Sequence, residues 1–325
     1  MNDYPSIAQL GHVTISTPDI EKSLWFFRDI LGMEEVARDG KRAYLRAYQE
    51  HEHHSLILED SNVAELQHVA FRTNRPEDVE GYARQFKDAG VDFIEVPKGT
   101  KTGQGDAIRF FMPHGGHPIE IFYDIDKPKA PEAIQSKLLS NSSTRRGLGV
   151  RRIDHVNLHT SGPELAKAEA WVIDNLGFKR REAMQVPDGP LFASWTSVTP
   201  QVHDMALVSN VQGKVGAFHH VAFNVESYSD ALTAADQLRD LGIQIDLGPG
   251  KHGVGQAMFL YVRDPGSGHR VEIYAGGYFI FAPDWEPKVW TPESFGEALV
   301  WYGEPLPMNA DANFSQTTNS TTKLV

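Results

Sequence analysis

A fourfold internal repeat constrains this chain more than any other feature of its sequence. Each copy opens with a histidine followed by alternating apolar residues, which is the pattern of a strand with one buried face. The four copies read LGHVTIST from Leu10, LQHVAFRT from Leu66, IDHVNLHT from Ile153 and FHHVAFNV from Phe218. An amphipathic helical stretch and several further strand-like segments follow each copy. The repeat therefore predicts an α+β fold made of four βαβββ modules.

Glycines close the four predicted helices, where a left-handed residue commonly ends a helix. They are Gly32, Gly90, Gly177 and Gly242. A different glycine pattern, Gly248, Gly250 and Gly253, spells GxGxxG, but a dinucleotide fingerprint requires a helix directly after it. The following residues, AMFLYV, read as a strand. We therefore interpret these glycines as turn formers and exclude a nucleotide site.

The modules pair into two halves. The second and fourth modules align without a gap, and the matched pairs lie 152 positions apart: His68 and His220, His117 and His269, Glu120 and Glu272. The polar segment Ser140–Gly147 has the composition of a linker. We expect two open-barrel domains at residues 1–140 and 148–300. A Pro/Trp-rich extension after about residue 278 should pack on the second half, and the polar end within 301–325 should be disordered.

Composition narrows the possible functions. The 325 residues suffice for two domains, and the net charge of −12 disfavours nucleic acid or an anionic membrane as the main partner. The absence of cysteine excludes disulfides, thiolate metal sites and cysteine nucleophiles. No signal peptide is evident, and no apolar run approaches the roughly 20 residues that span a bilayer. We expect a soluble, cytoplasmic protein.

Three residues of the last two modules are the strongest candidate metal ligands. His155 and His220 occupy equivalent positions of paired modules, so they should face each other across one cavity. Strand alternation places Glu272 inward on the closing strand of the fourth module. A single strand histidine is more often structural, but an inward glutamate is costly to bury unpaired. Two imidazoles and one carboxylate together predict the facial triad of non-haem Fe(II) oxygenases.

Adjacent histidines leave a choice of ligand at the fourth module. His12, His68 and His155 each directly precede valine, and so does His220. A one-residue shift along a strand moves a side chain to the opposite face. We therefore choose His220 over His219.

Four further motifs carry a family resemblance that runs from about residue 8 to 300. They are VHDMAL, FHHVAF, GPGKHGVGQAMFLYVRDP and GHRVEIY. The sequence resembles the type I extradiol ring-cleavage dioxygenases of the vicinal oxygen chelate superfamily, within the catechol 2,3-dioxygenase and homoprotocatechuate 2,3-dioxygenase group. The resemblance implies extradiol cleavage of a catechol by O2, giving a 2-hydroxymuconic semialdehyde-type product. It also implies a homotetramer.

The same resemblance assigns roles to individual residues. His155, His220 and Glu272 should bind Fe(II), with Mn(II) as a possible substitute. His203, on a strand near the end of the third module, should lie beside the O2 position. His252, on a loop, and Tyr261, on the next strand, should hydrogen-bond the substrate oxygens. Asn157 and Trp195 should line the pocket.

One position departs from the family pattern and predicts the kind of substrate. Homoprotocatechuate enzymes carry an arginine for the substrate carboxylate five residues before the loop histidine. This chain has Leu247 there. We therefore expect a neutral catechol or an alkyl, aryl or other uncharged derivative.

The N-terminal half keeps a second set, His12, His68 and Glu120, with His54 resembling His203. The positions that match His252 and Tyr261 are Thr100 and Arg109. Because these two positions lack the histidine and the tyrosine, we interpret this set as a duplicated relic with a structural role. The run HEHH at 51–54 resembles a metal cluster, but we interpret it as a solvated strand edge because neighbours on a strand face opposite ways.

Two other functions remain open for a chain of this type. One is a metal-dependent isomerase or lyase of the glyoxalase type, which usually has a second carboxylate ligand. The other is a metal-free protein that binds a small molecule, which needs neither the triad nor proton donors.

Overall fold

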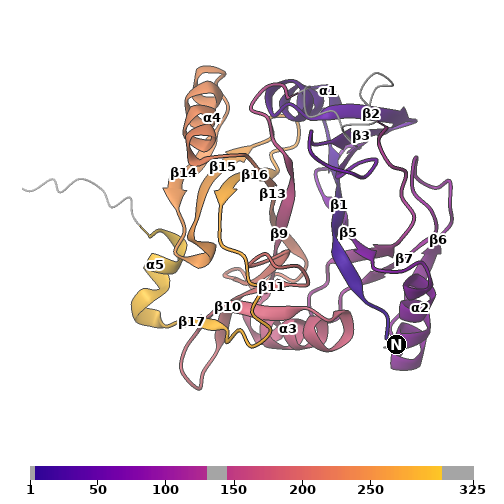
Figure 1. The fold of residues 1–325 in the computed structure, drawn as a ribbon, viewed down its shortest axis with the longest axis vertical. Coiled ribbons are helices and arrows are strands. Elements are labelled where there is room, and N and C mark those ends of the chain that lie inside the picture. The colour runs from indigo at the N-terminus through magenta and orange to yellow at the C-terminus, as the bar shows by residue number, and fades with distance from the viewer. Residues whose placement is uncertain (1–3, 130–144, 302–325) are drawn as a thin grey trace, which may run out of the picture.

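The computed structural model describes residues 4–129 and 145–301. Within them the chain folds into two sheets, one from each half of the sequence (Figure 1). The first half contains β1 (Ile7–Thr17), α1 (Ile20–Leu24), the π-helical turn η1 (Trp25–Ile30), β2 (Glu34–Asp39), β3 (Arg42–Arg46), β4 (Leu56–Asp60), β5 (Leu66–Thr73), α2 (Glu77–Ala89), β6 (Phe93–Val96), β7 (Ala107–Phe111) and β8 (Pro118–Phe122).

The second half repeats this order. It contains β9 (Arg152–Ser161), α3 (Gly162–Leu176), β10 (Lys179–Gln185), β11 (Leu191–Ser197), β12 (Met205–Asn210), β13 (Ala217–Asn224), α4 (Tyr228–Asp240), β14 (Ile245–Lys251), the short turn η4 (Val254–Gln256), β15 (Ala257–Arg263) and β16 (Arg270–Gly276). The α+β fold with four βαβββ modules is confirmed.

Sheet order explains how the repeat builds a site. The first sheet runs β2-β3-β4-β1-β5-β8-β7-β6, and the second runs β14-β15-β16-β13-β9-β12-β11-β10-β17, where β17 is Lys288–Trp290. In each sheet the first strands of two modules lie side by side at the centre and antiparallel, β1 with β5 and β9 with β13. The repeated histidines therefore meet in the middle of each sheet. Each order is open-ended, so neither sheet closes within the described residues.

The helices follow from local sequence signals. In α2 the apolar residues Tyr82 and Phe86 are spaced one turn apart and both are fully buried. Gly90 ends α2 in the left-handed region, with φ 69°. At the start of α4, Ser227 and Asp230 form a reciprocal capping box. The predicted glycine ends of all four helices have positive φ.

The two halves share one hydrophobic core, which includes residues of both sheets. Phe71 of the first half packs against Phe178 of the second, with ring centroids 5.3 Å apart. Phe27 and Phe223 meet in the same way at 6.2 Å. Burying each such ring contributes roughly 1.5–3 kcal/mol of stability.

Repeat-related histidines also join the halves. His117 donates from Nε2 to the backbone oxygen of Ala217 at 3.0 Å, and His269 donates from Nε2 to that of Ser16 at 3.2 Å. His117, just before β8, thus contacts β13 of the second half, and His269, just before β16, contacts β1 of the first half. These contacts between the halves explain why the repeat keeps a histidine at both positions.

The C-terminal extension packs on the second half, as expected. It adds β17 (Lys288–Trp290), which pairs in parallel with β10, the turn η5 (Pro292–Ser294) and α5 (Phe295–Leu299). Buried Glu182 anchors it by accepting hydrogen bonds from Trp290 Nε1 and Tyr278 Oη, both at 2.6 Å.

Some sequence predictions fall outside the described residues. Most of the linker, the exact domain boundaries and the tail after residue 301 are among them, so the division at 1–140 and 148–300 stays a prediction. Across the described ranges, no helix is long and apolar enough to cross a membrane.

Candidate metal centre

Three neighbouring strands bring the predicted ligands together. His155 on β9 lies opposite Ala222 on β13, and Ala222 lies opposite Glu272 on β16. His220 is two residues before Ala222 on β13, so it faces the same side of the sheet. The small side chain of Ala222 leaves space between the imidazole of His155 and the carboxylate of Glu272.

The three side chains converge on one buried point. The Nε2 atoms of His155 and His220 are 3.2 Å apart, and each lies 2.9 Å from Oε2 of Glu272. All three residues are 1% exposed. The other carboxylate oxygen, Oε1, has no hydrogen-bond partner among the described residues. A divalent ion fits this donor set, because two nitrogen lone pairs and one carboxylate point at a common centre.

Charge at the centre favours a cation. Burial lowers the pKa of His220 to about 4. Burial also lowers the pKa of His155, but hydrogen bonds with Asp154 and Glu272 outweigh it and raise that pKa to about 9. Burial alone would raise the pKa of Glu272, yet the charges and hydrogen bonds of His220 and His155 hold it well below its usual value. The buried carboxylate is therefore ionised, and its positive partner in the metal-free cluster is the protonated His155, a role that a divalent ion would take over.

Asp154 orients the first imidazole. Its Oδ1 lies 2.9 Å from Nδ1 of His155, which therefore donates its Nδ1–H. This bond keeps Nδ1 as the donor and aims Nε2 at the centre, where a bound metal would replace the Nε2 proton. Sequence reasoning missed Asp154, although the Asp-His pair was visible in the IDHVNLHT segment.

All nine predicted site residues line one cavity of about 780 Å³. They are His155, Asn157, Trp195, His203, His220, Leu247, His252, Tyr261 and Glu272. Trp195 lies on β11 and is buried, whereas Leu247 on β14 is 49% exposed at the rim. Asn157 on β9 presents a buried Oδ1 that has no partner among the described residues.

His203 packs directly on a candidate ligand. Its ring centroid is 3.9 Å from that of His155, and burial lowers its pKa well below the usual value. The predicted strand position of His203 is wrong, because it lies in the turn before β12. The next residue, Asp204, holds this turn by accepting backbone hydrogen bonds from Val198 and Thr199.

His252 and Tyr261 form a hydrogen-bonded pair. His252 lies on the loop after β14 as predicted, and its Nε2 is 3.1 Å from the hydroxyl of Tyr261. The Nδ1 of His252 donates to the backbone oxygen of Leu299 in α5, so Nε2 is the acceptor in this pair. Tyr261 lies opposite Glu272 on β15, and burial raises its pKa well above the usual value.

The structure adds cavity residues that sequence reasoning missed. His159, His219 and Tyr274 also line the cavity. Tyr274 follows Glu272 by two residues and meets the ring of His155 edge-on at 5.0 Å. Strand alternation could have found Tyr274, because every second residue of a strand faces the same side.

The expectation that His219 faces the opposite side of the sheet from His220 is wrong. A bulge between Phe218 and His220 breaks the alternation on β13. His219 therefore lines the same cavity as His220, stacked on His159 with ring centroids 4.7 Å apart. The choice of His220 as the candidate ligand agrees with its position beside Glu272.

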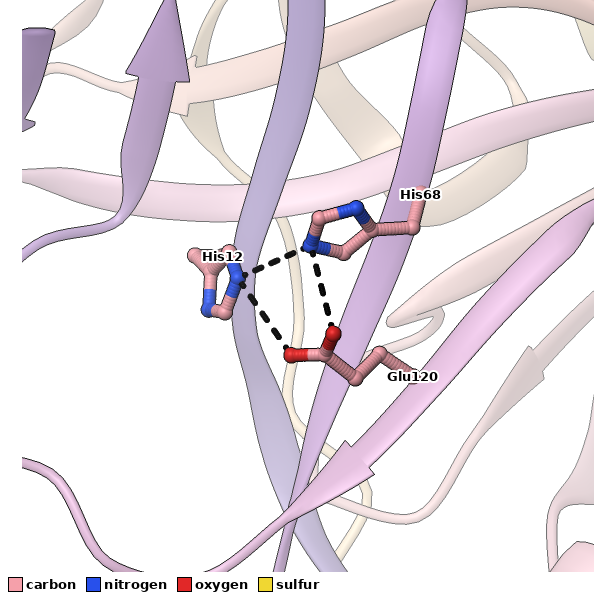
Figure 2. A group of neighbouring side chains, drawn as sticks. All are labelled: His12, His68 and Glu120. Atoms are coloured by element: carbon pink, nitrogen blue, oxygen red, sulfur yellow. Dashed lines mark hydrogen bonds and ion pairs between the residues drawn. The ribbon is translucent and has the colours of Figure 1, made fainter. Parts of the chain in front are cut away.

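The N-terminal half forms the equivalent cluster. Figure 2 shows His12 on β1, His68 on β5 and Glu120 on β8 pointing toward one another. The Nε2 atoms of the two histidines are 3.3 Å apart. Glu120 also accepts hydrogen bonds from Lys101 and Arg109. Two internal cations therefore surround this carboxylate.

The interpretation of HEHH as a solvated strand edge is wrong. Residues 51–54 lie in a loop, and His54 is fully buried with its ring centroid 4.7 Å from that of His12. Glu52 is buried too, and it pairs with Arg72 at 2.9 Å. The GxGxxG interpretation holds, because strand β15 follows the glycine loop and the turn η4.

Comparison with known proteins agrees with this geometry. The chain is 48% identical over 302 residues to a manganese-dependent 2,3-dihydroxybiphenyl 1,2-dioxygenase of Geobacillus genomosp. 3, covering 92% of this chain and 95% of the relative. It is 36% identical to a metapyrocatechase of Geobacillus stearothermophilus, covering 93% and 91%. The solved structure of homoprotocatechuate 2,3-dioxygenase from Arthrobacter globiformis superposes with a TM-score of 0.83 at 29% identity, covering 93% and 90%.

The family match covers both halves, at residues 9–121 and 152–273. These relatives confirm the predicted enzyme class, an extradiol catechol-type dioxygenase that uses Fe(II) or Mn(II). The repeat, the paired sheets and the His-His-Glu cluster thus have one explanation: the chain belongs to the Glyoxalase/Bleomycin resistance protein/Dioxygenase superfamily.

Proposed function

We propose that the protein cleaves the ring of a neutral catechol that carries an apolar substituent, at a metal held by His155, His220 and Glu272. The observation that carries this proposal is the lining of the cavity. Within the described residues, no lysine or arginine lines it, and Glu272 is the one acidic residue that does. An acidic substrate side chain would therefore have no charged partner.

The size and polarity of the cavity support a bulky substituent. Its volume of about 780 Å³ lies in the upper range for small-molecule pockets. Apolar side chains form the wall away from the metal ligands: Met184, Phe192, Trp195, Val208, Val211 and Leu299. Arg270 lies near Tyr261, but its charge is paired with Asp246 at 2.9 Å. An aryl ring, as in the 2,3-dihydroxybiphenyl named for the Geobacillus relative, suits this wall.

The chemistry that Fe(II) or Mn(II) supplies when bound is Lewis acidity toward the catechol oxygens and a shared position for O2. Tyr261, kept protonated by its raised pKa, can turn its single O–H from His252 to a substrate oxygen, which frees Nε2 of His252. His252 accepts at Nε2 and can take a hydroxyl proton there. His203 stands beside His155, where its neutral imidazole can donate an N–H hydrogen bond to O2 or accept a proton. Ring cleavage gives a 2-hydroxymuconic semialdehyde-type product.

Two alternative functions fit the site less well. A glyoxalase-type isomerase would use a second carboxylate ligand, whereas the other position here belongs to a histidine. A metal-free binding protein would need neither the converging His-His-Glu cluster nor the proton donors beside it.

Oxygen uptake tests the proposal. Protein purified without O2 and loaded with Fe(II) or Mn(II) should consume O2 and form a yellow product with 2,3-dihydroxybiphenyl and with catechol. 3,4-Dihydroxyphenylacetate should give a much lower kcat/KM. Lack of O2 uptake with all three diols would refute the proposed reaction, and a preference for the acid would refute the substrate class.

Substitution at the cavity rim tests charge selection. Leu247→Arg should shift the ratio of kcat/KM values toward 3,4-dihydroxyphenylacetate by roughly 10-fold or more, because a charged hydrogen bond contributes about 1.5–3 kcal/mol. Leu241→Arg adds the same charge at an exposed position outside the cavity lining and should leave the ratio unchanged. Equal shifts in both variants would show a nonspecific charge effect.

A cytoplasmic location and a homotetramer belong to the same proposal. The absence of cysteine is compatible with a reducing compartment. The family resemblance supports the tetramer, and light scattering of the purified protein would measure it.

A further inference from the structure

We propose that the N-terminal half contains a second site for a divalent transition metal, which the ammonium group of Lys101 keeps closed by taking the place of the ion. The candidate ligands are His12, His68 and Glu120, shown in Figure 2. All three are at most 2% exposed. Their strands repeat the register of the C-terminal site, with Ala70 opposite both His12 and Glu120.

Lys101 contacts this cluster as an ion would. Its Nζ hydrogen-bonds Oε1 of Glu120 and lies 2.9 Å from Nε2 of His68. Lys101 is 5% exposed, so a long, charged side chain is buried against two of the three potential ligands. An ammonium group has three N–H donors and no acceptor, so it occupies the lone pairs that would bind a metal.

The two clusters differ in the charged partners of their carboxylates. Glu120 has ion pairs with Lys101 and, at 2.7 Å, with Arg109. Glu272 has ion pairs only with histidines in the described chain. The N-terminal carboxylate is therefore compensated by a lysine and an arginine, whereas the C-terminal carboxylate has only imidazole partners, which can exchange their protons for a metal.

The C-terminal extension explains why a lysine is present in one half alone. The position that matches Lys101 in the repeat is Gly253. A Cβ atom there would lie 2.3 Å from the backbone oxygen of Glu297 and 2.8 Å from Trp290. The packed extension thus excludes a side chain at 253. At position 101 the side chain instead enters the cluster.

The N-terminal cluster also has a route to solvent. A cavity of about 260 Å³ is lined by His68, Lys101 and Arg109. An ion could therefore reach the ligands once the lysine is removed. The Nδ1 atoms of His12 and His68 have no hydrogen-bond partner in the described residues, in contrast to His155 with its Asp154. The opened site should therefore bind its ion more weakly than the C-terminal site.

Metal stoichiometry of the full chain tests this proposal. The unaltered protein, saturated with Mn(II) and desalted, should contain one ion per chain by elemental analysis. Two ions per chain would overturn the proposal, whatever the behaviour of any variant. Lys101→Ala combined with Arg109→Tyr, the residue at the matching C-terminal position, should raise the content to two.

Matched variants assign the added ion to the N-terminal ligands. Adding Glu120→Gln to the double variant should return the metal content to one ion per chain. Lys98 is an exposed lysine of the same loop, and Lys98→Ala made alone in the unaltered protein should leave the content at one. In a Glu272→Gln background the double substitution should raise Mn(II) binding from none to one ion per chain. Failure of the double variant to gain an ion, with an unchanged circular dichroism spectrum, would refute the proposal.

Thermal unfolding gives an independent measurement. Without metal, the double variant should melt at a lower temperature than the unaltered protein, because the buried carboxylate of Glu120 loses both cationic partners. Mn(II) should raise its melting temperature in the Glu272→Gln background and should have no effect there when Lys101 and Arg109 are retained. A Mn(II) response with both cations retained would mean that Lys101 does not close the site.

Discussion

At the scale of single residues, the site depends on groups that orient the ligands as much as on the ligands. Two imidazoles and one carboxylate meet within hydrogen-bond distance, and each histidine must present an unprotonated Nε2. For His155 the carboxylate of Asp154 accepts the Nδ1–H and so leaves Nε2 as the nitrogen that would bind a metal. The N-terminal cluster shows the opposite condition, with ligands of the same type and a lysine among them.

Asp154→Asn should lower the affinity for the metal by roughly 10- to 100-fold, because the orienting hydrogen bond and its negative charge are weakened. Competition with a chelator of known affinity would measure this loss. Asp174→Asn, at an exposed position of α3, is the matched control and should leave the affinity unchanged. Equal affinities in all three proteins would show that Asp154 has no role in ligand orientation.

At the scale of elements, the extension connects the end of the chain to the site. Three hydrogen bonds join α5 and Trp301 to residues 251–253, the segment that carries His252. The Nδ1 of His252 and the backbone N–H of Gly253 donate to the oxygens of Leu299 and Glu297, and Trp301 donates its backbone N–H to Lys251. These bonds hold the ring of His252 with Nε2 toward Tyr261.

A chain ending at Ser294 should therefore lose kcat by about 10- to 100-fold, because a poorly positioned catalytic group costs that much. A chain ending at Trp301 keeps the three contacts and is the matched control. Metal content should stay at one ion per chain in both, since the candidate ligands lie on β9, β13 and β16. Full activity in the shorter chain would contradict a positioning role for α5.

At the scale of the whole molecule, the halves form one core, and polar contacts join them beside it. Glu50 of the first half accepts hydrogen bonds from the backbone N–H of Ile153 in the second half and of Ala47 in its own, at 2.6 and 2.7 Å. Burial raises the pKa of Glu50 to about 7, although these bonds and one from Ser55 oppose the shift. Its ordinary value is 4.5.

The folded protein therefore binds a proton at Glu50 that the unfolded chain releases between pH 4.5 and about 7. The contribution of this group to stability is complete below the lower value and is lost as pH rises through the upper one. Urea unfolding at pH 5.5 and at pH 8 measures the free energy of unfolding of the unaltered protein and of Glu50→Gln. Between these two pH values the free energy of the variant should rise relative to that of the unaltered protein by roughly 1–3 kcal/mol. The difference between the two proteins cancels other titrating groups, and a pH-independent difference would contradict the prediction.

Much of this protein could be predicted from its sequence alone. The histidine repeat and its constant offset determined the four modules, the pairing into halves and the convergence of His155, His220 and Glu272. Period-two alternation assigns each side chain to a face of its strand, and symmetry between modules brings equivalent faces together. The family motifs added the roles expected for His203, His252 and Tyr261, all of which line the cavity.

Only the tertiary structure decided the features that depend on bulges, loops and contacts between distant segments. A bulge turned His219 into the cavity against the alternation rule, and a loop buried His54 beside His12. The docked extension left no room for a side chain at Gly253, while the equivalent loop of the first half placed Lys101 among the ligands. Periodicity acts within one strand, whereas these outcomes depend on which atoms of remote segments fill the same space.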